Sequence, residues 1–375
     1  MRSAVLFEIG QKLQLADVDL APPGQGEVRV KLAASGICAS DWHTMTGAIP
    51  SPAPAVLGHE GAGVVAAVGE GVTTVTPGDH VVLSWVPACG RCRLCERGRP
   101  NLCSVAAPAL LAGTLVSGQR RLSYQGDPLY HYSFLSTFAE ETVVDEAACI
   151  PIRSDVPLSV AALVGCAVMT GYGAVVNRAK VEVGSTVLIY GAGGVGLSAV
   201  MAAALSGAQH VVVVDPVAAK RELAAELGAT HTLDPGCDDV TEAVRSLTRG
   251  DGADYALEAA GRPELVAQAF DATRRGGTIV AVGVPGPDAQ VILPGPHLVR
   301  HEKVVTGSLY GSCHPRQDMP TVLDLYASGK LPLDRLITKI YPLEDINVAF
   351  HDMNSGKLAR GVIDFAMASV DEQAR

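Results

Sequence analysis

The sequence has few aromatic residues and little charge, and its basic residues are not grouped together. Of 375 residues, 5% are aromatic and 18% are charged, and the formal net charge is −10. Without a stripe of lysine or arginine, nucleic acid and anionic membrane surfaces are poor partner candidates. The first twenty residues mix charged and apolar side chains and lack a signal-peptide pattern. We therefore expect a cytoplasmic protein without a membrane span, and we interpret the alanine-rich stretch 196–205 as a buried helix.

The apolar residues, 48% of the chain, exceed what a single core holds, which predicts two domains. Up to about residue 150, short valine-rich runs alternate with Gly/Pro turns, so this part is predicted to be β-rich. The runs are 27–32, 61–68, 80–84 and 141–144.

From 168 to 310 the pattern changes to short apolar strands that alternate with helices, which predicts a doubly wound parallel sheet. The expected strands are 186–190, 210–215, 230–233, 255–258, 278–282 and 303–306, with helices at 195–206 and 218–227. After 310 we expect helices at 317–328 and 343–353 and a last strand at 361–365.

Four of the nine cysteines stand close together, as Cys89, Cys92, Cys95 and Cys103, with the spacing C-x2-C-x2-C-x7-C. Such a loop can wrap a tetrahedral ion with four sulfurs, and zinc prefers this closed thiolate shell. The alternatives are a redox thiol cluster and a disulfide pair, although disulfides are rare in a reducing cytoplasm.

A glycine-rich turn follows the predicted strand 186–190 and opens the next helix. The run Gly191-Ala192-Gly193-Gly194-Val195-Gly196 fits G-x-G-x-x-G, which lets a pyrophosphate approach the helix N-terminus. Asp215 ends the following strand, where an acid binds the adenosine ribose of NAD and repels the 2′-phosphate of NADP. The alternatives are a glycine turn that only packs helix on sheet and a helix-capping Asp215. Lys220 can reach the ribose or be an ordinary exposed lysine.

Three further ligand candidates, Cys38, His59 and Cys166, are scattered along the chain. Two thiolates and one imidazole would leave a fourth position open on zinc, as catalytic zinc sites require. Spacing alone does not unite these residues, and each alone is also compatible with a core cysteine or a hydrogen-bonded histidine.

Together, these segments resemble the zinc-dependent medium-chain alcohol dehydrogenases, over roughly residues 4 to 365. The resemblance rests on an ordered set of motifs: Gly36-Ile-Cys38-Ala-Ser40-Asp41-Trp-His43, Gly58-His59-Glu60-Gly61-Ala-Gly63, the four-cysteine run, Ser136-Thr137-Phe138-Ala139-Glu140, Gly165-Cys166 and the glycine-rich turn. It implies a GroES-like catalytic domain, 1–167 and 311–375, with a zinc lobe near 87–105. A Rossmann domain, 168–310, would be inserted in it.

The resemblance also implies residue roles. Cys38, His59 and Cys166 would hold a catalytic zinc and the four-cysteine run a structural zinc. Asp41 would orient the ligand histidine, Glu60 would approach the metal during ligand exchange, and Ser40 and His43 would form the proton relay. Three more residues would contact the cofactor: Thr170 behind the nicotinamide, Arg360 on the pyrophosphate, and Val284. Read alone, Arg360 is an ordinary exposed charge.

The same alignment gives the substrate pocket, which would be mainly apolar. Its expected residues are Ile49, Trp85, Pro108, Tyr132, Ser133, Val284 and Leu309. Ala39 stands where many relatives carry Arg or His against the pyrophosphate, so NAD binding should be weaker. The segment 111–134 matches an extra loop of the dimeric branch, which favours a homodimer over a tetramer.

Three functions are therefore compatible with the sequence. The leading one is NAD-linked, zinc-dependent interconversion of a primary apolar or aromatic alcohol with its aldehyde. In the second, NAD stays permanently bound and is recycled by a second substrate, which Ala39 disfavours. The third is a zinc-stabilised binding protein without catalysis.

Overall fold

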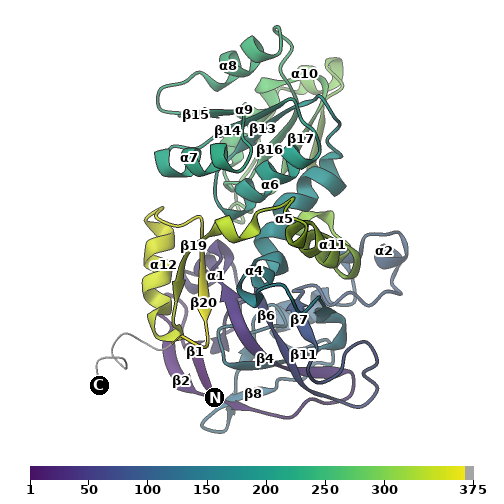
Figure 1. The fold of residues 1–375 in the computed structure, drawn as a ribbon, viewed down its shortest axis with the longest axis vertical. Coiled ribbons are helices and arrows are strands. Elements are labelled where there is room, and N and C mark those ends of the chain that lie inside the picture. The colour runs from purple at the N-terminus through teal and green to yellow at the C-terminus, as the bar shows by residue number, and fades with distance from the viewer. Residues whose placement is uncertain (368–375) are drawn as a thin grey trace. The chain divides into compact units, whose positions relative to one another are not determined.

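The computed structural model describes residues 1–367 and divides into two compact units (Figure 1). Unit 1 comprises Met1–Cys166, His314–Ala327 and the chain from Ile337 on; unit 2 comprises Ala167–Cys313 and Ser328–Leu336. The assignment of Ser328–Leu336 to unit 2 differs from the sequence expectation, which placed all of 311–375 in the catalytic domain. Its turn Leu333–Leu336 contacts helix α6 (Gly194–Leu205), and Arg335 pairs with Glu226 of unit 2. These contacts explain why 328–336 belongs to unit 2.

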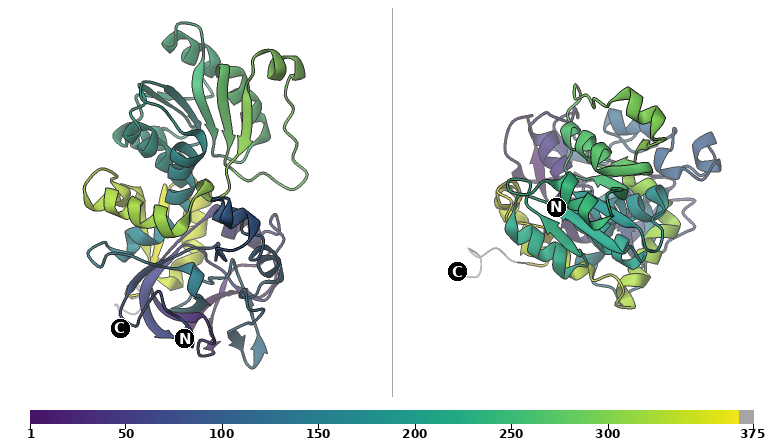
Figure 2. Two further views of the ribbon diagram at one scale, coloured as in Figure 1. Left: turned by 90° about the vertical axis from the view of Figure 1, so that its right-hand side faces the viewer. Right: turned by 90° about the horizontal axis from the view of Figure 1, so that it is seen from above.

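Unit 2 is built on a six-stranded parallel sheet in the order β15-β14-β13-β16-β17-β18, with helices on both faces (Figures 1 and 2). Leu188 and Val212 pack with Phe270 of α9 on one face, while the alternate residues of their strands are buried on the other. The predicted doubly wound sheet is confirmed. The strands are β13 (Thr186–Tyr190), β14 (His210–Val214), β15 (His231–Leu233), β16 (Ala253–Glu258), β17 (Thr273–Ala281) and β18 (Val304–Gly307). The helices besides α6 are α5 (Met169–Gly173), α7 (Ala218–Glu226), α8 (Val240–Leu247), α9 (Pro263–Ala272) and α10 (Gly295–Arg300).

Unit 1 is β-rich, as the sequence predicts, and its largest sheet is organised around the long strand β4 (Glu27–Gly36). β4 pairs antiparallel with β6, β11 and β20, so a C-terminal strand lies beside an N-terminal one. The other strands are β1 (Arg2–Leu6), β2 (Gln14–Asp17), β3 (Asp19–Leu20), β5 (Ala55–Val56), β6 (Gly61–Val68), β7 (His80–Leu83), β8 (Leu122–Tyr124), β9 (Asp127–Pro128), β10 (Tyr130–His131), β11 (Glu141–Asp145), β12 (Cys149–Pro151), β19 (Ile337–Tyr341) and β20 (Arg360–Asp364). The helices are α1 (Ala39–Met45), α2 (Arg93–Glu96), α3 (Ala107–Ala112), α4 (Leu158–Leu163), α11 (Pro315–Ala327) and α12 (Ile346–Asn354).

One helical run, Leu158–Ala179, is long and apolar enough to cross a membrane, which the sequence inspection overlooked. Of its most apolar window, 78% is buried inside the protein, as expected for a core helix. The run contains two π-helical stretches, Val164–Val168 and Ala174–Ala179, and the first of them contains Cys166. Such π turns occur frequently at functional sites.

The predicted extra loop, 111–134, folds against the start of β4 through a polar network. Arg121 pairs with the buried Glu27, and the Arg121 backbone N–H donates to Nε2 of the buried His131 at 3.1 Å. Burial lowers the pKa of His131 to about 4, and the nearby Arg121 and Arg120 charges act in the same direction while Glu27 opposes them. His131 is therefore neutral in the folded protein.

We expect this histidine to make the fold acid-sensitive. Below pH 6.5 the unfolded chain binds a proton that the folded chain does not bind until about pH 4. Stability is therefore lost as the pH falls through this window, by about 2 kcal/mol at pH 5. His131→Gln, which retains an acceptor near Nε2, should remove this loss in urea unfolding at pH 7.5 and pH 5. An equal loss of stability in the variant and the wild type would contradict the assignment.

Candidate metal centres and dinucleotide site

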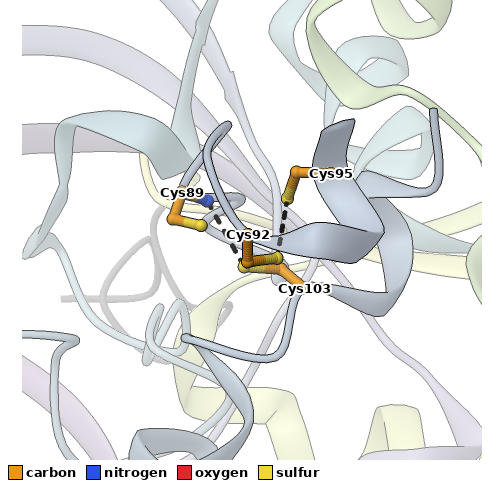
Figure 3. A group of neighbouring side chains, drawn as sticks. All are labelled: Cys89, Cys92, Cys95 and Cys103. Atoms are coloured by element: carbon orange, nitrogen blue, oxygen red, sulfur yellow. Dashed lines mark hydrogen bonds between the residues drawn. The ribbon is translucent and has the colours of Figure 1, made fainter. Parts of the chain in front are cut away.

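The four clustered cysteines enclose a small volume in one lobe of unit 1 (Figure 3). All four sulfurs lie within 4.8 Å of one another, with Cys92 Sγ 3.5 Å from Cys95 Sγ and 4.0 Å from Cys103 Sγ. Sulfurs around a tetrahedral zinc stand about 3.8 Å apart, given Zn–S bonds of about 2.3 Å. The spacings match that value and exceed a disulfide bond of about 2.05 Å, so the thiols fit an ion and form no disulfide.

The pKa values of the thiols in this lobe also favour a bound cation. A backbone hydrogen bond from Cys95 and bonds from Ser104 lower the pKa of Cys92 to about 5. Burial, together with the neighbouring thiols, raises the pKa of Cys95 to about 12. One thiolate therefore suppresses ionisation of the next, and a bound cation would relieve this repulsion.

A second donor cluster lies within unit 1 and unites the scattered residues that the sequence singled out. Cys38, His59, Glu60 and Cys166 each bring a ligand atom to within 4.8 Å of the others. Cys38 is the N-cap of α1, His59 and Glu60 directly precede β6, and Cys166 lies in the π turn. Gly165 allows this convergence, since a Cβ there would lie 2.9 Å from the carbonyl of Leu83 and 3.5 Å from Cα of Glu60.

Asp41 fixes the orientation of the histidine in this cluster. It is fully buried, and its Oδ1 lies 3.1 Å from Nδ1 of His59 and accepts the Gly58 backbone N–H at 3.1 Å. Its Oδ2 accepts the Cys38 N–H. Since Nδ1 is engaged, Nε2 is the His59 nitrogen available to a metal, an arrangement common around zinc. Burial acts to lower the pKa of His59, but Asp41 and Cys38 raise it well above its usual value.

Glu60 and Arg360 form an ion pair inside the protein, 300 residues apart in sequence. The side chain of Glu60 is fully buried, Arg360 is 6% exposed, and Arg360 Nη2 donates to Glu60 Oε2. Burial raises the pKa of Glu60 to about 8, against the attraction of Arg360. The other oxygen, Oε1, is buried and has no hydrogen-bond partner among residues 1–367, which fits a carboxylate beside a cation. Reading Arg360 as an exposed charge is wrong, and its contact with a pyrophosphate stays a prediction.

Ser40 and His43 lie on α1, partly exposed and three residues apart, which places them on one helical face. Ala39 precedes them and is exposed.

In unit 2 the glycine-rich turn joins β13 to α6. Gly196 packs against the turn, since a Cβ there would lie 1.8 Å from the Gly191 carbonyl oxygen. Gly193, the N-cap of α6, has open space beside its Cα, so packing does not explain the glycine while a ligand's approach does. Gly194, Val195 and Gly196 form the first turn of α6.

Asp215 stands at the end of β14 beside a cavity of about 650 Å³, which Lys220 also lines. Its carboxylate accepts the backbone N–H groups of Ala192 and Val217 at 2.8 and 2.9 Å. The carboxylate thus ties the glycine-rich turn to the next strand, a role that the sequence did not predict. It is not the helix cap considered as the alternative, because the N-cap of α7 is Val217.

The residues expected to line a substrate pocket come from both units. Ile49, Trp85, Pro108, Tyr132 and Ser133 belong to unit 1; Leu309 and Val284, together with the cofactor candidate Thr170, belong to unit 2. Tyr132 is buried, with its ring 5.7 Å from the His59 ring in an edge contact. Val284 and Leu309 are 60% and 45% exposed.

Residues 24–154 match the model of the alcohol dehydrogenase GroES-like domain, and residues 194–328 match that of the zinc-binding dehydrogenases. A Mycobacterium tuberculosis protein, provisionally named alcohol dehydrogenase D, is 44% identical over 96% of this chain and 98% of its own length. The chain belongs to the zinc-dependent medium-chain alcohol dehydrogenases. This confirms the resemblance seen in the sequence and its GroES-like and Rossmann fold class.

The chain is also similar to other dehydrogenases, at 29 to 41% identity. The NDMA-dependent alcohol dehydrogenase of Amycolatopsis methanolica is 41% identical over 96% of this chain and 98% of its own. The benzyl alcohol dehydrogenase of Acinetobacter calcoaceticus is 35% identical, with a TM-score of 0.92 over 97% of this chain and 98% of its own. A zinc-binding dehydrogenase from Sinorhizobium meliloti, solved with NADP bound, is 29% identical, with a TM-score of 0.80 over 97% and 98%. Zinc and a nicotinamide cofactor are therefore the cofactors of the group to which the chain belongs.

The two donor clusters should hold metal independently. Cys92→Ser should lose one of two zinc ions per chain and lower the thermal midpoint, since a closed thiolate site stabilises its lobe. Cys38→Ser should lose the other ion and leave the thermal midpoint closer to that of the wild type. Metal content by mass spectrometry and thermal unfolding measure both effects. A Cys38→Ser protein that retains two ions would contradict the assignment of the second cluster.

Proposed function

We propose that the protein oxidises primary apolar or aromatic alcohols to aldehydes with NAD and a catalytic zinc, and reduces the aldehydes in reverse. The observation that carries this proposal is the convergence of Cys38, His59 and Cys166, of which His59 is buried and Cys166 is partly exposed. Cys38 directly precedes helix α1, on which Ser40 and His43 lie. A structural zinc would be held by Cys89, Cys92, Cys95 and Cys103.

Each residue has a distinct part in this reaction. Zinc bound to Cys38, His59 and Cys166 would polarise the alcohol oxygen and lower its pKa, and NAD would accept the hydride. Ser40 accepts the proton of the alcohol hydroxyl as it releases its own toward His43, and His43 passes that proton to solvent, which their partial exposure permits. Asp41 holds the His59 ring, and Arg360 restrains Glu60 beside the donor cluster.

The acidity of the cavity beside Asp215 supports NAD rather than NADP. Asp215, Asp238, Asp239 and Glu264 line it, against Lys220 and Arg262. Arg262 is paired with Glu264, so little positive charge is left for a 2′-phosphate. The side-chain hydrogen bonds of Asp215 keep its carboxylate at the end of β14.

The preference for an aromatic or apolar alcohol rests on two features. The expected pocket residues include Trp85 and Tyr132, whose rings favour apolar substrates. The similarity to the benzyl alcohol dehydrogenase of A. calcoaceticus agrees with this preference.

The second candidate function has the same alcohol oxidation but a different use of the cofactor. NAD stays bound to the protein, and a second substrate reoxidises the NADH that the alcohol has produced. The similarity to the NDMA-dependent enzyme of A. methanolica favours this cycle. Ala39 speaks against it, because no basic side chain stands at this position to hold the pyrophosphate.

We also propose a homodimer in a reducing, cytoplasmic compartment. β18 ends the sheet of unit 2, and Val304 and Val305 on it are 49% and 36% exposed, as in strands that pair with a second copy. None of the nine cysteines, all of which lie in the described part of the chain, forms a disulfide, which is usual in reducing compartments.

Turnover of the purified, zinc-loaded protein tests the proposal. Benzyl alcohol with NAD should produce NADH absorbance, and Ser40→Ala should slow it at least about 100-fold with unchanged metal content. If neither benzylic nor aliphatic alcohols reduce NAD, the leading proposal fails. If nucleotide instead survives exhaustive dialysis and alcohol oxidation requires NDMA, the second cycle replaces it.

Asp215→Asn tests the cofactor preference. It keeps an acceptor for the Ala192 N–H but removes the charge, so the ratio of kcat/KM for NAD over NADP should fall at least about tenfold. Asp238→Asn, on the same cavity, is the control and should change the ratio much less. An unchanged ratio in Asp215→Asn would remove this residue from cofactor selection.

A further inference from the structure

The hydroxyl of Tyr132 connects to the helix that carries the proposed relay. It accepts a hydrogen bond from Thr44 Oγ1 at 3.0 Å and donates one to the backbone carbonyl of Ser40 at 3.2 Å. Thr44 is fully buried and Tyr132 is 7% exposed. Both partners belong to α1, whose next residue after Ser40 is Asp41.

The ring of the same tyrosine also contacts His59, a member of the donor cluster. It meets the His59 imidazole at 5.7 Å between ring centroids and at an angle of 70°. Tyr132 therefore contacts His59 with its ring and α1 with its hydroxyl. Asp41, which is also on α1, bonds the same imidazole. His59 and α1 are therefore connected in two ways, through the Asp41 carboxylate and through Tyr132.

The backbone that presents Tyr132 is held in a costly conformation. Ser133, Phe134 and Ser136 have φ values of 47°, 66° and 50°, in the left-handed region that non-glycine residues rarely adopt. Such a conformation is unfavourable for a non-glycine residue and persists only where its surroundings enforce it. The carbonyl of Tyr132 accepts the N–H groups of Leu135 and Ser136, and its own N–H donates to Ser136 Oγ.

These contacts argue against Tyr132 as a polar contact for substrate. The phenol has one proton to donate, and Ser40 accepts it; the Thr44 hydroxyl occupies a lone pair. The side chain thus offers a substrate only its ring, whereas its polar end serves α1.

We propose that Tyr132 is a positioning residue that sets the place of α1, and hence of Ser40 and Asp41, relative to the His59 imidazole. The proposal rests on the function proposed above, because its consequence is the alignment of the relay hydroxyl with a substrate held at the cluster. Loss of the phenol oxygen should loosen this alignment without removing a metal ligand.

The experiment compares Tyr132→Phe, Thr44→Val and the double variant, with Tyr130→Phe, a change in the neighbouring strand β10, as control. Tyr132→Phe removes both hydrogen bonds of the phenol, whereas Thr44→Val removes one of them. We expect kcat to fall about 3- to 10-fold in Tyr132→Phe and by no more than that in Thr44→Val. The double variant should be no slower than Tyr132→Phe, because that variant already lacks the bond that Thr44→Val removes. KM for NAD should not change, and Tyr130→Phe should behave as the wild type.

A second readout does not depend on turnover. With cobalt in place of zinc at the open site, the visible d–d bands should shift in Tyr132→Phe and Thr44→Val while two metal ions per chain are retained. If the spectra and kcat equal those of the wild type, or the two substitutions multiply, the proposal is wrong. If only KM for the alcohol rises, Tyr132 is a substrate contact instead. If the wild type reduces no NAD, the proposed function fails, whereas the cobalt spectra still test Tyr132.

Discussion

The structure of the candidate site depends on one constraint: ionisable groups that are buried together must be compensated. Cys38, His59, Glu60 and Cys166 bring their donor atoms into one cluster, in which Cys166 stays partly exposed. Hydrogen bonding to Cys166 and the charge of His59 lower the pKa of Cys38, although burial opposes this. Two thiolates beside a buried carboxylate are unfavourable in a medium of low dielectric constant unless cations balance them. The guanidinium of Arg360 supplies part of that balance, and a metal ion bound by the cluster would supply the rest.

This constraint explains why so much of unit 1 converges on the cluster. Asp41 holds the imidazole from α1, Arg360 reaches Glu60 from the last strand, and Tyr132 reaches both α1 and His59. The donors thus stand in a fixed frame rather than on mobile loops, and frames of this kind position reactive groups within a fraction of an ångström. A zinc ion held by the four-cysteine lobe would have no further ligand position and would only stabilise the chain around it.

The sequence predicted best what depends on local spacing. β6 has the bounds expected from its valine-rich run, β13 has those expected of a short apolar strand, and the four cysteines meet as their spacing indicates. Residue spacing did not unite Cys38, His59 and Cys166, because side chains so far apart meet only through the fold; the family resemblance supplied that set. The Glu60–Arg360 pair and the Tyr132 hydroxyl bonds were missed for the same reason. The apolar run 158–179 escaped notice because polar and glycine residues interrupt it, although its burial marks it as a core helix.

The most direct test of the central claim is X-ray absorption at the zinc edge of the purified protein. Four sulfurs would bind one ion and two would bind the other, which gives six sulfurs for two ions. The mean zinc shell should therefore contain about three sulfurs at about 2.3 Å, with nitrogen or oxygen at about 2.0 to 2.2 Å. One ion per chain in a shell of four sulfurs, without nitrogen or oxygen, would contradict the account.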